Sequence, residues 1–142
     1  MKFKVRETLE RDYQRIYSLL GESHLRDDYF NEENFKRMLA RNPHLCYVAV
    51  CETTPIGTIF GTHDGAFRGY IQKLAVFEGM RRLGVGSALV ERVLEQFDAE
   101  NIPLIFAHVE KDNGASLALF NSLGFKIRES HCLIDRGYKK RG

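Results

Sequence analysis

Residues 74–89 pass from a run of apolar residues through a glycine-spaced turn into a helix, and this pattern constrains the fold more than any other part of the chain. Gly84 and Gly86 have no side chains, so the backbone between Arg81 and Gly86 can approach an anion closely and direct its N–H groups toward it. The helix that begins there adds unpaired N–H groups and the positive end of its dipole. The segment therefore predicts a strand–turn–helix unit that binds a pyrophosphate or a similar anion.

Several anion-binding motifs share this design, and residue spacing separates them. A P-loop needs a Lys directly after its second glycine, and the turn has none. A dinucleotide-binding turn needs a third Gly or Ala where this chain has Leu89. The remaining pattern, Arg-x-x-Gly-x-Gly at residues 81–86, resembles the acetyl-coenzyme A motif of the GNAT family of N-acetyltransferases. An ordinary turn, in which the glycines only ease the change of direction, is the alternative.

A second segment, residues 113–125, resembles a later motif of the same family, in which an Asn opens a helix that ends in Leu-Gly-Phe. The two motifs occur in the family's order, and the resemblance extends loosely over nearly the whole chain. It implies that acetyl-coenzyme A is the cosubstrate. The coenzyme-binding residues that it implies are Leu74, Ala75, Val76, Arg81, Arg82, Leu83, Gly84, Val85, Gly86, Ser87, Asn113 and Phe120.

The composition is that of one globular domain covering residues 1–142. Hydrophobic residues make up 44% and charged residues 28%, which indicates neither disorder nor a coiled coil. The net charge of +2, from 21 basic and 19 acidic residues, is too balanced to predict a nucleic-acid partner. No apolar run approaches the roughly 18 residues needed to cross a bilayer. We therefore expect a cytoplasmic protein with no membrane partner.

The cysteines give no sign of a metal site. Cys46, Cys51 and Cys132 are odd in number, and no two of them form a Cys-x-x-Cys pair. This arrangement fits reduced, buried thiols better than disulfides or zinc ligands. We therefore expect no bound metal.

The periodicity of the apolar residues predicts alternating strands and helices. Strands are expected near residues 3–5 and over 46–51, 56–62, 70–76 and 104–109, helices over 9–20, 31–40 and 84–100 and from residue 113, and terminal β structure over 125–134. This order predicts an α/β sandwich, with a mixed central sheet and helices on both faces. The GNAT fold has the same order. In that fold the fourth and fifth strands splay apart, and the pantetheine arm of the coenzyme pairs with backbone that corresponds here to residues 74–76.

Acetyl transfer to an amine requires a neutral amine, a polarised thioester carbonyl and a proton for the departing thiolate. The resemblance assigns the carbonyl contact to the N–H of Val76. Many family members carry a Tyr seven residues after the motif's Asn as the proton donor, but this chain has Phe120. We interpret Phe120 as a buried helix residue that packs near the sulfur end of the coenzyme. The proton must then come from another acid or from solvent.

Candidates for handling the amine proton lie on two predicted strands. Some family members place Glu or His at the positions of Tyr70 and Gln72, neither of which is a good base near neutral pH. These two side chains share a face by strand alternation, so they can bind a water or the acceptor. His108 has a suitable intrinsic pKa and precedes the Asn-led helix. The catalytic candidates are therefore Tyr70 and His108, and a hydrogen-bonded structural role for His108 stays open.

The sequence thus predicts an N-acetyltransferase that moves an acetyl group from acetyl-coenzyme A directly to a primary amine in a ternary complex. The acceptor is a small amine or a peptide or protein amine, with specificity expected in residues 22–41 and 63–70. The alternative is an acyl-coenzyme A sensor or interaction domain with little catalysis, because Phe120 replaces the usual Tyr and no strong base occupies positions 70 or 72. Homodimerisation through the late strands is a further expectation.

Overall fold

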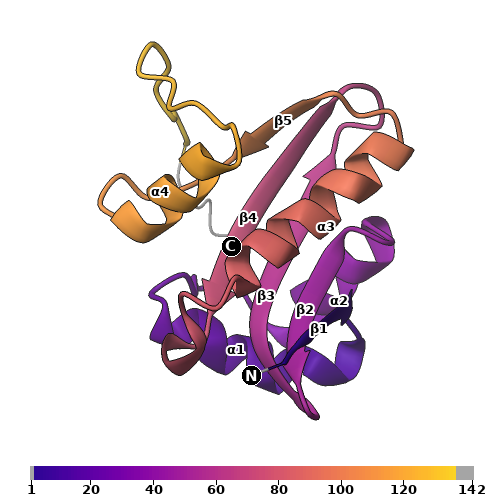
Figure 1. The fold of residues 1–142 in the computed structure, drawn as a ribbon. Coiled ribbons are helices and arrows are strands. Elements are labelled where there is room, and N and C mark those ends of the chain that lie inside the picture. Colours follow the sequence, from indigo (N-terminus) through magenta and orange to yellow (C-terminus); the bar gives the residue numbers. More distant parts are fainter. Residues whose placement is uncertain (1, 137–142) are drawn as a thin grey trace.

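The computed structural model describes residues 2–136, which form a five-stranded sheet in the order β1-β2-β3-β4-β5. The strands are β1 (Lys4–Glu7), β2 (Cys46–Cys51), β3 (Thr54–His63), β4 (Arg68–Val76) and β5 (Leu104–Ala107). Neighbouring strands from β1 to β4 are antiparallel, whereas β5 runs parallel to β4. The predicted mixed sheet is therefore confirmed (Figure 1).

Helices cover both faces of this sheet, as the sequence pattern predicted (Figure 1). They are α1 (Tyr13–Glu22), α2 (Glu32–Arg41), α3 (Val85–Ala99) and α4 (Gly114–Ser122), with 3-10 turns η1 (Glu10–Asp12) and η2 (Glu78–Met80). Helices α1 and α2 pack on one face of the sheet, and α3 packs on the other face. Within residues 2–136, no helix has the length and apolar character that spanning a membrane requires.

Strand alternation in β2 explains the two hydrophobic layers. Tyr47 and Ala49 point into the cluster beneath α3, while Cys46 and Val48 point into the cluster that contains α1 and α2. All four side chains are buried. Because fully burying a large apolar side chain stabilises the fold by about 1.5–3 kcal/mol, a strand buried on both faces anchors both layers.

β4 and β5 lie side by side along only part of their length. The paired residues run from Arg68 and Leu104 to Ile71 and Ala107, and β4 then continues to Val76 beyond the end of β5. At the paired end the strands meet closely. A Cβ atom on Gly69 would lie 2.8 Å from Phe97 and 2.9 Å from Ile105, so only glycine fits there. The two strands therefore touch tightly at one end and leave a gap at the other.

β4 is interrupted by a β-bulge just before this gap. The register passes from Phe60 opposite Gln72 to Thr58 opposite Ala75, so two residues of β4 face one residue of β3. Lys73, the first of these two residues, has a φ of +55°. A bulge increases the local twist of a strand, which favours the departure of β4 from β5.

The expectation of terminal β structure over residues 125–134 is wrong. These residues carry no strand, and Ile127, Leu133 and Ile134 are 65%, 73% and 88% exposed. Extended backbone becomes a strand only when a neighbour pairs with it, and apolar residues in a sequence do not show that a neighbour is present. Leu133 and Ile134 are moreover adjacent, so they do not follow the alternation of a half-buried strand.

Candidate active site

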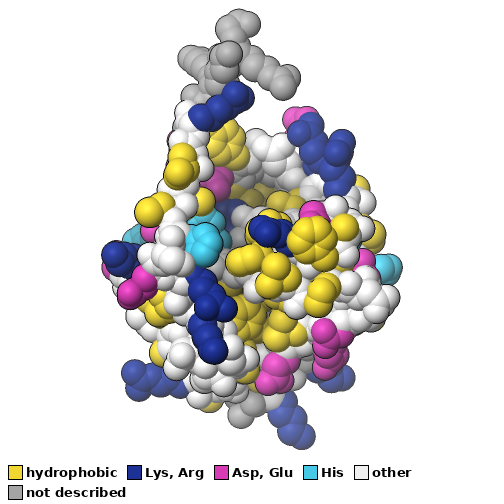
Figure 2. Space-filling model, turned by 90° about the horizontal axis from the view of Figure 1, so that it is seen from above, with side chains coloured by type: hydrophobic (Ala, Val, Ile, Leu, Met, Phe, Trp, Pro, Cys, Tyr) yellow, Lys and Arg dark blue, Asp and Glu magenta, His cyan; other side chains and the backbone are white. Residues whose placement is uncertain are grey.

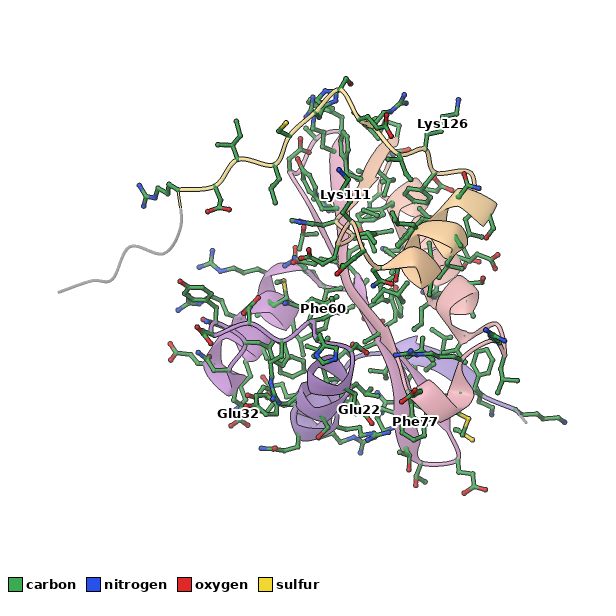
Figure 3. The ribbon with its side chains drawn as sticks, turned by 90° about the vertical axis from the view of Figure 1, so that its left-hand side faces the viewer. Glu22, Glu32, Phe60, Phe77, Lys111 and Lys126 are labelled. Carbon is green, nitrogen blue, oxygen red and sulfur yellow. The ribbon has the colours of Figure 1, made fainter. Side chains whose placement is uncertain are left out.

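A cleft of about 1120 Å³ opens where β4 and β5 part. Figure 3 shows its two sides, with Glu22 at the end of α1 and Lys111 ahead of α4. Seen from above, the opposite end of the molecule, where β4 and β5 pair, carries apolar side chains on its surface with Lys and Arg side chains among them (Figure 2). Four segments line the cleft: residues 22–25, 74–76, 78–87 and 110–119, represented by Glu22, Ser23, His24, Leu25, Leu74, Ala75, Val76, Glu78, Met80, Arg81, Arg82, Gly84, Val85, Gly86, Ser87, Glu110, Asp112, Asn113, Ala115, Ser116, Ala118 and Leu119.

The turn before α3 has the strand–turn–helix geometry that the sequence predicted. Gly84 precedes the helix with a φ of +82°, a left-handed conformation that glycine adopts without strain. The first helical hydrogen bond at this end runs from the N–H of Ala88 to the carbonyl of Gly84 at 3.0 Å. Helix geometry therefore leaves the N–H groups of residues 85–87 without acceptors inside the helix, and all three residues line the cleft. The exposed side chains of Arg81 and Arg82 add positive charge beside them.

The last residues of β4 direct backbone groups into the same cleft. The N–H of Phe77 donates to the carbonyl of Ile56 on β3 at 2.7 Å. Because neighbouring residues of a strand point their N–H groups to opposite edges, the N–H of Val76 faces away from β3. That edge of β4 is the one that β5 leaves uncovered. An elongated ligand with its own amides can therefore pair along residues 74–76.

The opposite wall comes from the beginning of α4. The side-chain oxygen of Asn113 accepts the N–H of Ser116 at 3.1 Å, which confirms the predicted helix cap. Phe120 is buried at 5% exposure and packs edge-on against Phe125, with ring centroids 5.0 Å apart. Phe120 lies behind the residues that line the cleft, whereas Leu119 is one of the lining residues. Leu83 of the turn is 48% exposed and also lies outside the described lining.

Tyr70 lies on β4 and His108 directly follows β5, close to the point where the two strands separate. Tyr70 is 42% exposed and stacks on Phe106 of β5, with centroids 5.8 Å apart. The backbone N–H of His108 donates to the carbonyl of Ile71 at 3.1 Å, and its side chain is exposed. Both residues lie outside the described lining of the cleft. The structure thus places Tyr70 on β4 and His108 just after β5, next to the cleft rather than within its walls.

A contact that the sequence did not indicate joins β4 to the segment between α1 and α2. The ammonium of Lys73 lies 2.9 Å from a carboxylate oxygen of Asp27 and 3.1 Å from the carbonyl of Leu25. Burial alone would raise the pKa of Asp27, but the hydrogen bond and charge of Lys73, together with the backbone N–H groups of Tyr29 and Phe30, lower that pKa on balance. Because the two side chains are 46 residues apart in the sequence, no local pattern could have found this pair.

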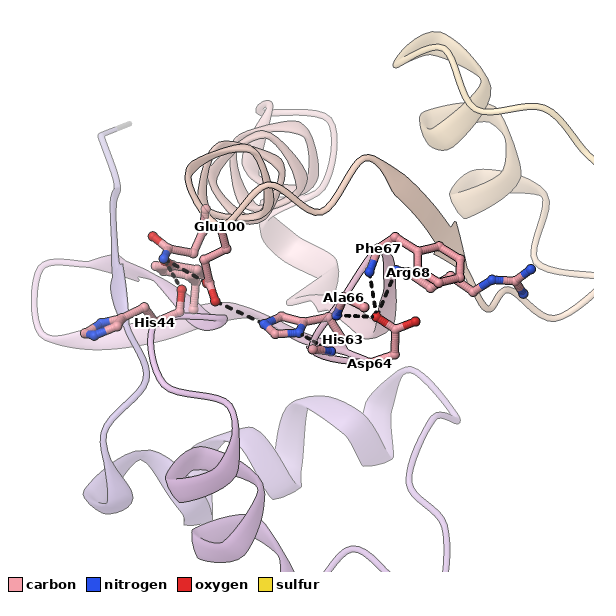
Figure 4. A network of polar contacts seen from close by, with 10 residues as sticks. His44, His63, Asp64, Ala66, Phe67, Arg68 and Glu100 are labelled. Atoms are coloured by element: carbon pink, nitrogen blue, oxygen red, sulfur yellow. Dashed lines mark hydrogen bonds and ion pairs between the residues drawn. The ribbon is translucent and has the colours of Figure 1, made fainter.

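His63 and Asp64 are ordered at the turn between β3 and β4, away from the cleft lining (Figure 4). The Nδ1 atom of His63 accepts the N–H of Gly65 at 2.9 Å, so Nε2 carries the proton that is donated to Glu100 at 3.0 Å. Hydrogen bonds from the backbone N–H groups of residues 68, 66 and 67 lower the pKa of Asp64. This network ties the turn to the end of α3.

Comparison with known proteins agrees with this geometry. A model of the acetyltransferase (GNAT) family matches residues 5–125. The chain belongs to the GNAT family. Its relatives include acetyltransferase SG1711 from Sodalis glossinidius, which is 30% identical over 105 residues, covering 74% of this chain and 73% of the relative.

Solved GNAT structures share the fold over most of the chain. Ard1 from Thermoplasma volcanium superposes with a TM-score of 0.82 at 24% identity, covering 90% of this chain and 85% of Ard1. A chain of the NatC complex, bound to Gag peptide and CoA, has a TM-score of 0.77 at 28% identity and covers 89% of this chain and 86% of its own. The GNAT chain described here is an acetyltransferase with acetyl-coenzyme A as its cosubstrate. These relatives do not favour the sensor alternative.

Proposed function

We propose that this GNAT enzyme transfers the acetyl group to a primary amine within a ternary complex, and that the amine approaches from the Tyr70 side of the cleft. The observation that carries the proposal is the uncovered edge of β4, which presents the N–H of Val76 between the anion-binding turn and Tyr70. The NatC complex, one chain of which shares this fold, is bound to Gag peptide and CoA, which supports a peptide amine as one acceptor class.

Each wall of the cleft has a separate task in this proposal. When bound, acetyl-coenzyme A supplies an activated acetyl thioester. The turn at residues 81–86 holds its pyrophosphate through backbone N–H groups and arginine charge. The N–H of Val76 donates to the thioester oxygen and stabilises the negative charge that develops there. These tasks rest mainly on backbone groups, so they place few demands on side chains.

The amine nitrogen attacks the carbonyl carbon, so that a C–N bond forms and the C–S bond breaks. The proton lost by the amine leaves through a water held near Tyr70 and His108, and the sulfur leaves as a thiolate or takes a proton from solvent. Phe120 has no proton to give. A thiol with a pKa of about 8–9, by analogy with cysteine, leaves without a strong acid.

The test combines binding and turnover in the same samples. Thermal unfolding is measured with acetyl-coenzyme A, coenzyme A or NAD, and thiol release is then followed with ethanolamine, Nα-acetyl-lysine and a peptide with a free N-terminus. We expect stabilisation by both coenzyme A species, because a ligand that binds the folded state raises its stability, and thiol release with at least one amine. Stabilisation without amine-dependent thiol release contradicts the proposed transfer, and absence of stabilisation contradicts the assigned coenzyme site.

A further inference from the structure

The segment between α1 and α2 forms one wall of the cleft and is neither helix nor strand, although the N–H groups of Ser23 and Leu25 donate to carbonyls at the end of α1. Ser23, His24 and Leu25 line the cleft, and α2 begins only at Glu32. His24 has a φ of +57°. A segment of this kind opens locally more easily than the strands of the core unless side-chain contacts hold it. What holds residues 23–30 therefore determines the shape of this wall.

Lys73 contacts this segment at several points. Its ammonium lies 2.9 Å from Asp27, 3.1 Å from the carbonyl of Leu25 and 6.0 Å from the ring centroid of Phe30. The Lys73 side chain is 15% exposed, whereas that of Asp27 is 52% exposed. A largely buried ammonium needs partners for its charge, and residues 25–30 supply them. The contact therefore differs from an ordinary exposed ion pair.

The position of Lys73 within β4 gives this contact its importance. Gln72 and Tyr70 precede Lys73 on the side from which the amine is proposed to approach, and residues 74–76 follow it along the coenzyme side. The bulge places Lys73 in a left-handed conformation, which is uncommon for a residue other than glycine. These contacts of Lys73 with Leu25 and Asp27, called the tether below, thus join the segment to β4 at the boundary between the two proposed binding regions.

Arg26, a cation within the segment itself, contacts α1 rather than the sheet. The guanidinium of Arg26 lies 3.9 Å from the ring centroid of Tyr17 and donates to the carbonyl of Tyr17 at 3.3 Å. Arg26 therefore attaches the segment to α1, on its own side of the cleft. Lys73 is the cation that spans from the segment to the sheet.

We propose that Lys73 is a positioning residue that holds residues 23–30 against β4 and thereby sets the cleft wall that contacts the acceptor amine. The proposal rests on the acetyl transfer proposed above. Lys73 itself touches neither the coenzyme nor the reacting atoms. Its loss should therefore weaken acceptor binding while coenzyme binding at the turn of residues 81–86 is retained.

The experiment compares Lys73→Met, which keeps the length of the side chain and removes its charge, with Lys73→Arg and Asp27→Asn. Lys36→Met is the matched control, because Lys36 is an exposed lysine of α2 whose ammonium lies 3.8 Å from a carboxylate oxygen of Glu32. The first readout is the rate of limited trypsin cleavage after Arg26, which requires no acceptor. The second is the KM for acetyl-coenzyme A and for whichever of the three amines the wild-type protein acetylates.

We expect Lys73→Met to accelerate cleavage after Arg26 by about fivefold or more, because cleavage follows local opening. The acceptor KM should rise about tenfold while kcat and the coenzyme KM stay within about twofold, because the lost interaction holds the acceptor in ground state and transition state alike. Asp27→Asn should act in the same direction, and the double variant should be no worse than Lys73→Met. Lys73→Arg should restore most of both readouts, and Lys36→Met should change neither.

An unchanged rate of cleavage after Arg26 in Lys73→Met overturns the proposal that Lys73 holds residues 23–30 against β4. Faster cleavage with an unchanged acceptor KM overturns its role in acceptor binding, and an equal rise in both KM values assigns Lys73 to general stability instead. A wild-type protein that acetylates none of the amines contradicts the proposed function, while the cleavage rates still decide whether Lys73 holds the segment.

Discussion

Gly84 occupies a backbone conformation that other residues adopt only with strain, at the point where α3 begins. Its φ is +82°, and a Cβ atom there would meet nothing within 4 Å. The demand for glycine is therefore set by the backbone and by what approaches it, and not by neighbouring side chains. Gly65, at the turn between β3 and β4, has a φ of +81° and equally open surroundings. The chain thus contains a matched position far from the coenzyme site.

Gly84→Ala should lower the free energy of unfolding by about 1–2 kcal/mol, because an L-residue is strained in this conformation. It should also weaken acetyl-coenzyme A binding about tenfold or more, equivalent to about 1.4 kcal/mol, because the turn can no longer keep its shape against the pyrophosphate. Calorimetric titration and denaturant unfolding measure the two effects. Gly65→Ala should lose similar stability and keep its affinity for the coenzyme; equal losses of affinity in both variants would show that the effect is not specific to the turn.

Asp12 links the first strand to the first helix at the scale of whole elements. Its carboxylate, 4% exposed, accepts two hydrogen bonds from Arg6 of β1, at 2.8 and 3.0 Å, and one from the N–H of Leu9 at 2.8 Å. Burial raises the pKa of Asp12, but the hydrogen bonds from Arg6 and Leu9 outweigh it and lower the pKa below its usual value. The ionised form therefore stabilises the junction of β1 with η1 and α1.

Asp12→Asn should lower the free energy of unfolding at pH 7 by about 1.5–3 kcal/mol, as expected for hydrogen bonds to a charged group. Because the folded pKa is lower than the unfolded one, this stabilisation is present above the unfolded value of about 4 and is lost as the pH falls through the folded value. Urea unfolding at pH 7 and pH 3 should therefore show a smaller difference between the proteins at pH 3. Glu10→Gln, an exposed change in the same 3-10 turn, should have little effect, and a difference that grows in acid would contradict the assignment.

The elements that sequence reasoning predicted well are those whose signals are local. The cap of α4 depends on Asn113 and a backbone group three residues away, and the glycine turn before α3 depends on six consecutive residues. Predictions failed or were missing where distant parts of the chain meet. The 125–134 segment has no strand partner, and the contact between Lys73 and Asp27 joins residues that are 46 positions apart in the sequence. Such contacts are consequences of the assembled fold.

At the scale of the whole molecule, β5 and α4 are attached less firmly than the centre of the sheet. β3 is paired with β2 and β4, whereas β5 pairs with β4 between Leu104 and Ala107, and α4 follows it on the far wall of the cleft. Native-state stability is commonly lowest where few buried contacts are made. The half of the site formed by β5 and α4 is therefore the part expected to open first.

Hydrogen exchange should show this difference directly. Amides of β5 and α4 should exchange faster than those of β3, and acetyl-coenzyme A should slow them because it contacts both walls of the cleft. Mass spectrometry of peptides covering residues 104–122 measures the change, and NAD serves as the comparator ligand. Protection of β5 equal to that of β3 without the coenzyme would contradict the expected order of opening.

The close contact at Gly69 has a mechanical consequence. β4, β5 and α3 meet there with no space for a methyl group, and the bond between His63 and Glu100 fastens the adjacent turn to the end of α3. This end of the molecule is therefore expected to act as a hinge. Displacements of β5 and α4 about this hinge increase with distance from it. Thermal motion should therefore change the width of the cleft most at its mouth and least at its closed end.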